Sequence, residues 1–246
     1  MNWLGLPVQA SRHAAEIDHV LGIEHWMMAI LFVFWIGYFL LALFKFRKGA
    51  NPRARYQGMR SYWSVYLVFL VAAAEGVLLF GYEMPQWVER TRNLPRVEAA
   101  TVVRVVAEQF AWNIHYPGPD RLFGRTDIAL VSSDNPLGLD RRDPAAKDDI
   151  TTVNQLTLPV DVPVLVHLTS KDMVHSFGLP EMRVKQDAIP GADTPVWFVP
   201  SRVGNYEIAC AQICGLGHYR MRGFVNIKSP TDYQAFLADE ARSLSR

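Results

Sequence analysis

Residues 210–221 read CAQICGLGHYRM and contain the only two cysteines of the 246-residue chain. His218 and Met221 follow them, so the run has the pattern C-x3-C-x3-H-x2-M. Two cysteines at this spacing can form a disulfide, bind zinc or bind a softer metal. The residues around the two cysteines therefore distinguish among these three kinds of site, and the kind of site indicates the fold that carries it.

The methionine separates these three possibilities. A Cys210–Cys214 disulfide is the simplest reading for a domain in an oxidising compartment. Zinc accepts thiolates and imidazoles but gains nothing from a thioether. Thiolate, imidazole and thioether together are the ligand set of copper, and blue-copper sites on β-sandwiches use one Cys, two His and a weak Met. Met221 and a second histidine, His175 in MVHSFGLP, therefore favour copper.

The second cysteine exceeds what a mononuclear blue-copper site needs. Two thiolates that reach one point can bridge two copper ions, and His175 and His218 can each cap one ion. The residues of this set therefore predict a binuclear copper centre.

The segment that carries this pattern reads as an all-β domain. Its short apolar runs, rich in Val, Ile and Thr, are bounded by Pro, Gly and Asp and show no helical period. We expect a sandwich or barrel with a polar loop at residues 132–150 and a short helix in the tail from residue 230. The predicted strands are TVVRVVAEQ (101–109), NQLTLPV (154–160), VPVLVHLTS (162–170), TPVWFVP (194–200) and NYEIAC (205–210).

Two long apolar stretches precede this domain. Residues 26–44 contain no charge, and residues 61–82 contain only Glu75, so each is long enough to span a bilayer as a helix. Together they predict a transmembrane hairpin. A cleaved signal peptide is the alternative for the first stretch, but acidic residues precede it where a signal peptide has a basic region.

The connector at residues 45–60 sets the predicted orientation. It contains six basic residues and no acidic one, which places it in the cytoplasm by the positive-inside rule. The N-terminal segment 1–25 and the β domain 83–246 then lie outside, in the periplasm of a bacterium whose inner membrane holds the hairpin. The basic residues are Lys45, Arg47, Lys48, Arg53, Arg55 and Arg60.

With DMVHSFGLPEMRVKQDAIPG (172–191) and QFAWNIHYPG (109–118), the cysteine motif resembles subunit II of the haem-copper cytochrome c oxidases. The resemblance covers nearly the whole chain. It implies a cupredoxin fold and the binuclear CuA centre, with Cys210 and Cys214 as bridging thiolates. It further implies His175 and His218 as terminal ligands, Met221 as a weak ligand to one copper, and the Gln212 carbonyl as a weak ligand to the other.

Two positions depart from the family pattern. The family usually has Glu where this chain has Gln212, so the side chain that commonly contributes to a magnesium site at the subunit I interface is missing. Many relatives carry a tryptophan at the position of Phe110, where electrons are thought to enter. Trp112 lies nearby, and either aromatic residue is a candidate for that role.

The resemblance implies an electron relay in a proton-translocating cytochrome-c oxidase. Electrons would arrive singly from cytochrome c or another periplasmic donor and pass to haem in subunit I, where haem and a further copper reduce oxygen; subunit III is another expected partner. The alternatives are a membrane-anchored protein that binds or delivers copper, and the CuA subunit of a nitric oxide reductase. The net charge of +1 does not indicate nucleic-acid binding.

Overall fold

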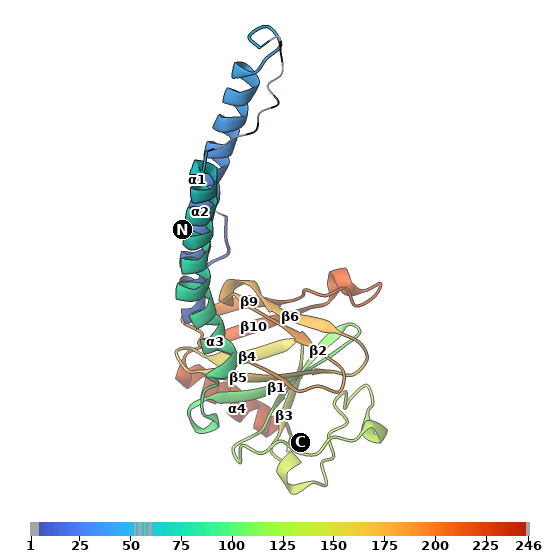
Figure 1. Ribbon diagram of the computed structural model, residues 1–246. Helices are drawn as coiled ribbons and strands as arrows, with labels where there is room; N and C mark the ends of the chain where they lie inside the picture. The colour runs from blue at the N-terminus through green and yellow to red at the C-terminus, as the bar shows by residue number, and fades with distance from the viewer. Residues whose placement is uncertain (1–4, 52, 54–55, 57, 59–60, 245–246) are drawn as a thin grey trace. The chain divides into compact units, whose positions relative to one another are not determined.

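A computed structural model describes residues 5–51, 53, 56, 58 and 61–244 of the chain (Figure 1). The chain divides into two units: residues 17–88 form a helical unit, and residues up to 16 join residues from 89 onward in a β-rich unit.

The helical unit contains two long helical runs. Helix α1 spans Arg12–Lys45. Helix α2, Trp63–Leu78, continues through a π-helical turn, Leu79–Glu83, into α3, Met84–Arg92. Both runs are long and apolar enough to cross a membrane, and their apolar side chains are largely exposed, as lipid-facing side chains are.

The helices are longer than the predicted stretches 26–44 and 61–82. Helix α1 begins at Arg12, inside the predicted outer segment 1–25, and the second run extends to Arg92. A charge-free window marks only the part of a helix that hydrocarbon can cover, because polar residues continue a helix into water without ending it. Of the six basic residues predicted in the connector, Arg55 and Arg60 lie outside the described residues.

Two five-stranded sheets face each other in the β-rich unit and form a cupredoxin-like sandwich, which confirms the predicted fold class (Figure 1). One sheet has the order β3-β2-β1-β5-β8 and the other β4-β10-β9-β6-β7. The first contains β1 Thr101–Glu108, β2 Ala111–Tyr116, β3 Ile150–Val153, β5 Val164–Ser170 and β8 Thr194–Phe198. The second contains β4 Gln155–Pro159, β6 His175–Leu179, β7 Val184–Ala188, β9 Gly204–Cys210 and β10 Arg222–Lys228.

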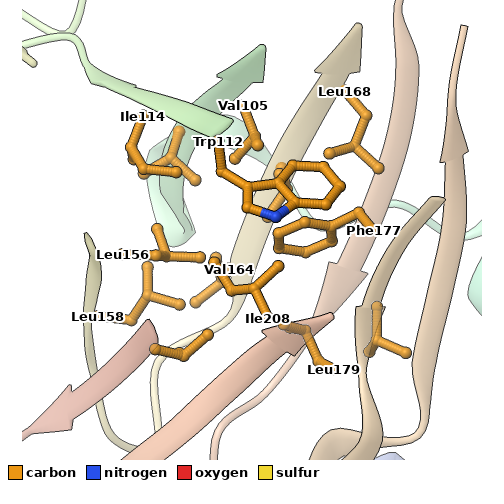
Figure 2. Packing of buried hydrophobic residues seen from close by; sticks show 14 of the residues in the cluster. Val105, Trp112, Ile114, Leu156, Leu158, Val164, Leu168, Phe177, Leu179 and Ile208 are labelled. Atoms are coloured by element: carbon orange, nitrogen blue, oxygen red, sulfur yellow. The ribbon is translucent and has the colours of Figure 1, made fainter. Parts of the chain in front are cut away.

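The core lies between the two sheets. Figure 2 shows Trp112 of β2 against Phe177 of β6, with their ring centroids 5.5 Å apart. Aliphatic side chains from both sheets surround this pair, and all are buried. The core therefore fixes β6, the strand that carries His175, against the first sheet.

The five predicted strands are present as β1, β4, β5, β8 and β9, and the predicted tail helix is α4, Pro230–Leu244. Strand β2 was not among the predicted runs, since almost every residue in it is buried and its sequence does not alternate. Strand β10 was also missed, although Val225 and Ile227 alternate with the polar Asn226 and Lys228 in its sequence.

The N-terminal segment packs on the β sandwich. The Ala10 amide donates to the Glu181 carbonyl at 2.8 Å, and the Ser201 amide donates to the Ala10 carbonyl at 2.8 Å. The Ser11 hydroxyl donates to the Met182 carbonyl at 2.7 Å. Ala10 and Ser11 are thus an integral part of the β-rich unit.

Candidate metal centre

Three neighbouring strands place the predicted ligands at one end of the second sheet. His175 is the first residue of β6, Cys210 is the last residue of β9, and Met221 directly precedes β10. Strand β9 pairs with both of the others. The Cys210 amide donates to the Met221 carbonyl at 3.3 Å, so the loop between β9 and β10 closes on itself.

This loop brings the two thiols together. The Sγ atoms of Cys210 and Cys214 are 3.7 Å apart, well beyond the S–S bond length of about 2.05 Å, and both cysteines are free. The predicted alternative of a disulfide is thus not the arrangement in this structure.

Each thiol has its own histidine. Cys210 Sγ lies 3.9 Å from His175 Nδ1, and Cys214 Sγ lies 3.6 Å from His218 Nδ1. Met221 Sδ lies 3.1 Å from His175 Nδ1 and 3.6 Å from Cys214 Sγ. The Gln212 carbonyl oxygen lies 3.2 Å from Cys210 Sγ. All six positions predicted as ligands are therefore gathered in one cluster.

The donor set fits two copper ions. Paired thiols with one imidazole on each side match two ions bridged by sulfur, and the thioether is a donor that copper uses and zinc does not. His175 and Cys214 are fully buried. Burial and the adjacent Cys210 thiol raise the pKa of Cys214 to about 11, so a metal ion must displace its proton.

Asp172 sets the orientation of the His175 ring. Asp172 Oδ1 lies 2.8 Å from His175 Nε2, which leaves Nδ1 facing the sulfur atoms. Burial of the Asp172 carboxyl opposes its ionisation, but hydrogen bonds from His175 and from the Gln109 and Met173 amides outweigh this and lower its pKa. A carboxylate on the far nitrogen is the usual partner of a metal-binding histidine.

The two aromatic candidates for the residue where electrons enter lie in different environments. Trp112 is fully buried, with its ring centroid 6.3 Å from that of His175. Phe110 is half-buried. It packs on residues 210–221, named the copper loop after their predicted role, so closely that a Cβ atom at Gly217 would lie 2.4 Å from its ring. Of the two, only Phe110 has solvent-exposed surface.

Residues 101–228 match the family described as cytochrome c oxidase subunit II, periplasmic domain. The alternative cytochrome c oxidase subunit 2 of Bradyrhizobium diazoefficiens is 32% identical over 225 residues, which cover 91% of this chain and 80% of the relative. The chain belongs to this family.

Other members of the family are more distant. Cytochrome c oxidase subunit 2 of Cereibacter sphaeroides is 25% identical, with 97% of this chain and 80% of the relative covered. The crystal structure of the periplasmic domain of a Bradyrhizobium japonicum oxidase subunit II covers 61% of this chain and 99% of its own, at 24% identity and a TM-score of 0.45. As a subunit II, this chain is a component of an oxidoreductase, and its two apolar helices fit a membrane anchor.

Proposed function

We propose that the chain is the electron-transfer subunit of a respiratory cytochrome c oxidase. It accepts single electrons at a binuclear CuA centre from cytochrome c or another periplasmic donor. It passes them to haem in subunit I, where oxygen is reduced to water and protons are pumped. The observation that carries this proposal is the pair of thiols 3.7 Å apart, each with its own histidine, in a member of the subunit II family.

The residues of the site suit electron transfer. Two copper ions bound here would supply one-electron redox chemistry. The ligands come from strand ends that adjacent hydrogen-bonded strands hold in place, so the donors can keep their positions when the charge of the site changes. Full burial of His175 and Cys214 keeps water from these donors. The same burial favours a resident metal over one that is released, which weighs against a copper-delivery protein.

The proposed location is a bacterial inner membrane, with both termini and the β domain in the periplasm. Hydrogen bonds from Ala10, Ser11 and Ser201 join the N-terminal segment to the β sandwich, so the start of α1 and the domain lie on the same side. The basic connector 45–60 is the proposed cytoplasmic loop.

Subunit I and a donor are the proposed partners, with subunit III as a further one. The copper loop exposes three large apolar side chains, and apolar surface of this kind marks protein contacts. They are Ile213 at 77%, Leu216 at 98% and Tyr219 at 85% exposed. Phe110, beside Gly217, is the proposed residue for receiving electrons. Gln212 has a neutral side chain, so we propose no carboxylate ligand for magnesium from this position.

The test is copper loading of the full-length chain in detergent, because a truncated chain that begins after the hairpin lacks the N-terminal residues that pack on the sandwich. We expect a purple protein with two copper ions per chain and a paramagnetic resonance spectrum of one unpaired electron shared equally by both. A blue or colourless protein with one metal, or a Cys210–Cys214 disulfide that refuses copper, would contradict the proposal. Co-purification with an oxygen-reducing haem protein separates an oxidase from a nitric oxide reductase.

A further inference from the structure

The turn between β1 and β2 reaches across to the copper site from the opposite sheet. Gln109 lies in this turn, and its side-chain Nε2 donates to the Cys214 carbonyl at 2.7 Å. The same nitrogen lies 3.2 Å from Met173 Sδ. The side chain thus contacts both the copper loop and the segment that leads to His175.

The backbone of Gln109 makes a second connection. Its amide donates to Asp172 Oδ2 at 2.7 Å, while Asp172 Oδ1 lies 2.8 Å from His175 Nε2. Asp172 Oδ1 also accepts from the Met173 amide at 2.7 Å, which fixes the carboxylate against its own backbone. A continuous chain of hydrogen bonds therefore runs from the Gln109 amide to the ring of one proposed ligand.

The copper loop is shaped to receive this turn. Gly215 has a φ of +120°, and a Cβ atom there would lie 2.7 Å from Gln109 Nε2. Glycine at this position permits both the backbone conformation and the close approach. The loop that carries Cys214 and His218 is therefore fitted to the Gln109 side chain rather than merely adjacent to it.

We propose that Gln109 is a positioning residue that joins the two ligand-bearing segments and holds Cys214 and His175 in register before copper binds. Its side-chain amide fixes the copper loop through the Cys214 carbonyl, and its backbone fixes the His175 ring through Asp172. The expected effects on bound copper rest on the proposed function. The arrangement of the metal-free site does not depend on it.

The role makes two predictions for variants that keep the length of the side chain but lose its N–H donor, Gln109→Met and Gln109→Glu. In the reduced, metal-free full chain, Cys214 should react faster with a thiol reagent, by about two- to tenfold, as expected from the loss of one hydrogen bond. With copper, the two nuclei should become inequivalent in the resonance spectrum and the reduction potential should shift. Gln234→Met, an exposed change on α4, is the matched control.

The two variants distinguish the effect of losing the N–H donor from the effects of added charge and of altered side-chain packing. If Gln109→Met matches the wild type in thiol reactivity and copper spectrum while Gln109→Glu does not, the effect is one of charge and the proposal is overturned. It is also overturned if the melting temperature of metal-free Gln109→Met falls while both readouts stay as in the wild type. If the wild-type chain itself fails to bind two copper ions, the proposed function fails, and thiol reactivity alone then decides the role of Gln109.

Discussion

Tyr116 joins the two sheets through its hydroxyl group. The hydroxyl accepts from the Thr157 amide at 2.8 Å and donates to the Thr157 carbonyl at 3.3 Å, across from β2 to β4. The side chain is buried, and burial of the phenol raises its pKa, so it remains a neutral donor. One side chain therefore satisfies two backbone groups that water cannot reach.

Replacing Tyr116 by Phe should leave the Thr157 amide without this partner. We expect the free energy of unfolding to fall by about 1–2 kcal/mol, the usual cost of a buried unsatisfied group. Denaturant unfolding of the metal-free chain measures this, and the copper spectrum should not change. Tyr56→Phe, on an exposed side chain far from the proposed ligands in the sequence, serves as the control. Equal stability of Tyr116→Phe and the wild type would show that the hydroxyl contributes nothing to the sandwich.

Removal of the Cys214 thiolate and removal of the Met221 thioether should affect copper binding differently. Cys214→Ser removes a proposed bridging atom, so binding should fall from two copper ions to one or none. Met221→Leu conserves volume and removes only the proposed weak donor, so two ions should remain while the reduction potential shifts. Metal analysis and redox titration check these outcomes. Loss of both ions from Met221→Leu would assign the thioether a larger role than the proposed one.

At the scale of the element, the clustering of the predicted ligand positions could be expected because five of the six lie in a single twelve-residue stretch. The contacts of Gln109 with the copper loop and with Asp172 could not be predicted, because they join segments of the two different sheets that lie far apart in the sequence. Strands β1 and β5 could be predicted from runs of β-branched residues between turn signals. Strand β2, almost wholly buried, gives no alternating pattern by which to recognise it.

The polar insertion between β2 and β3 is held by Asp140. Its carboxylate accepts from Arg142 Nε at 3.0 Å and from Arg125 Nη2 at 2.6 Å, and these hydrogen bonds hold the pKa of Asp140 well below its usual range. Because the pKa is lower in the folded state, the ionised carboxylate stabilises the fold above the unfolded pKa of about 3.9. This stabilisation is lost progressively as the pH falls from that value toward the pKa of the folded state.

Asp140→Asn should therefore lower the melting temperature at pH 7, where the carboxylate is ionised in both states. The difference in melting temperature between the variant and the wild type should stay constant from about pH 5 upward. It should narrow below about pH 4, where the carboxylate becomes protonated in the unfolded chain but stays ionised in the folded one. Thermal unfolding across this range measures it. A gap that does not change with pH would mean that shape, and not charge, is what Asp140 contributes.

At the scale of the whole molecule, Ser11 connects the first turn of α1 to the β sandwich. Its hydroxyl accepts from the Ala14 amide at 3.0 Å, which caps the start of α1. The same hydroxyl donates to the Met182 carbonyl at 2.7 Å, beside the strand pair that carries His175. The first turn of α1 is thus fixed directly to the β sandwich.

Ser11→Ala should weaken both connections, because the capped amide and the Met182 carbonyl lose their partner together. We expect a loss of about 0.5–2 kcal/mol in the local stability of this junction, the range for removal of a helix cap. Hydrogen exchange of the Ala14 amide and limited proteolysis before Arg12 measure it in the full chain. Ser11→Thr keeps the hydroxyl and should behave as the wild type. If Ser11→Ala destabilises the junction without altering copper binding, the start of α1 and the metal site are stabilised independently. If copper binding falls as well, the contacts of Ser11 also help to maintain the metal site.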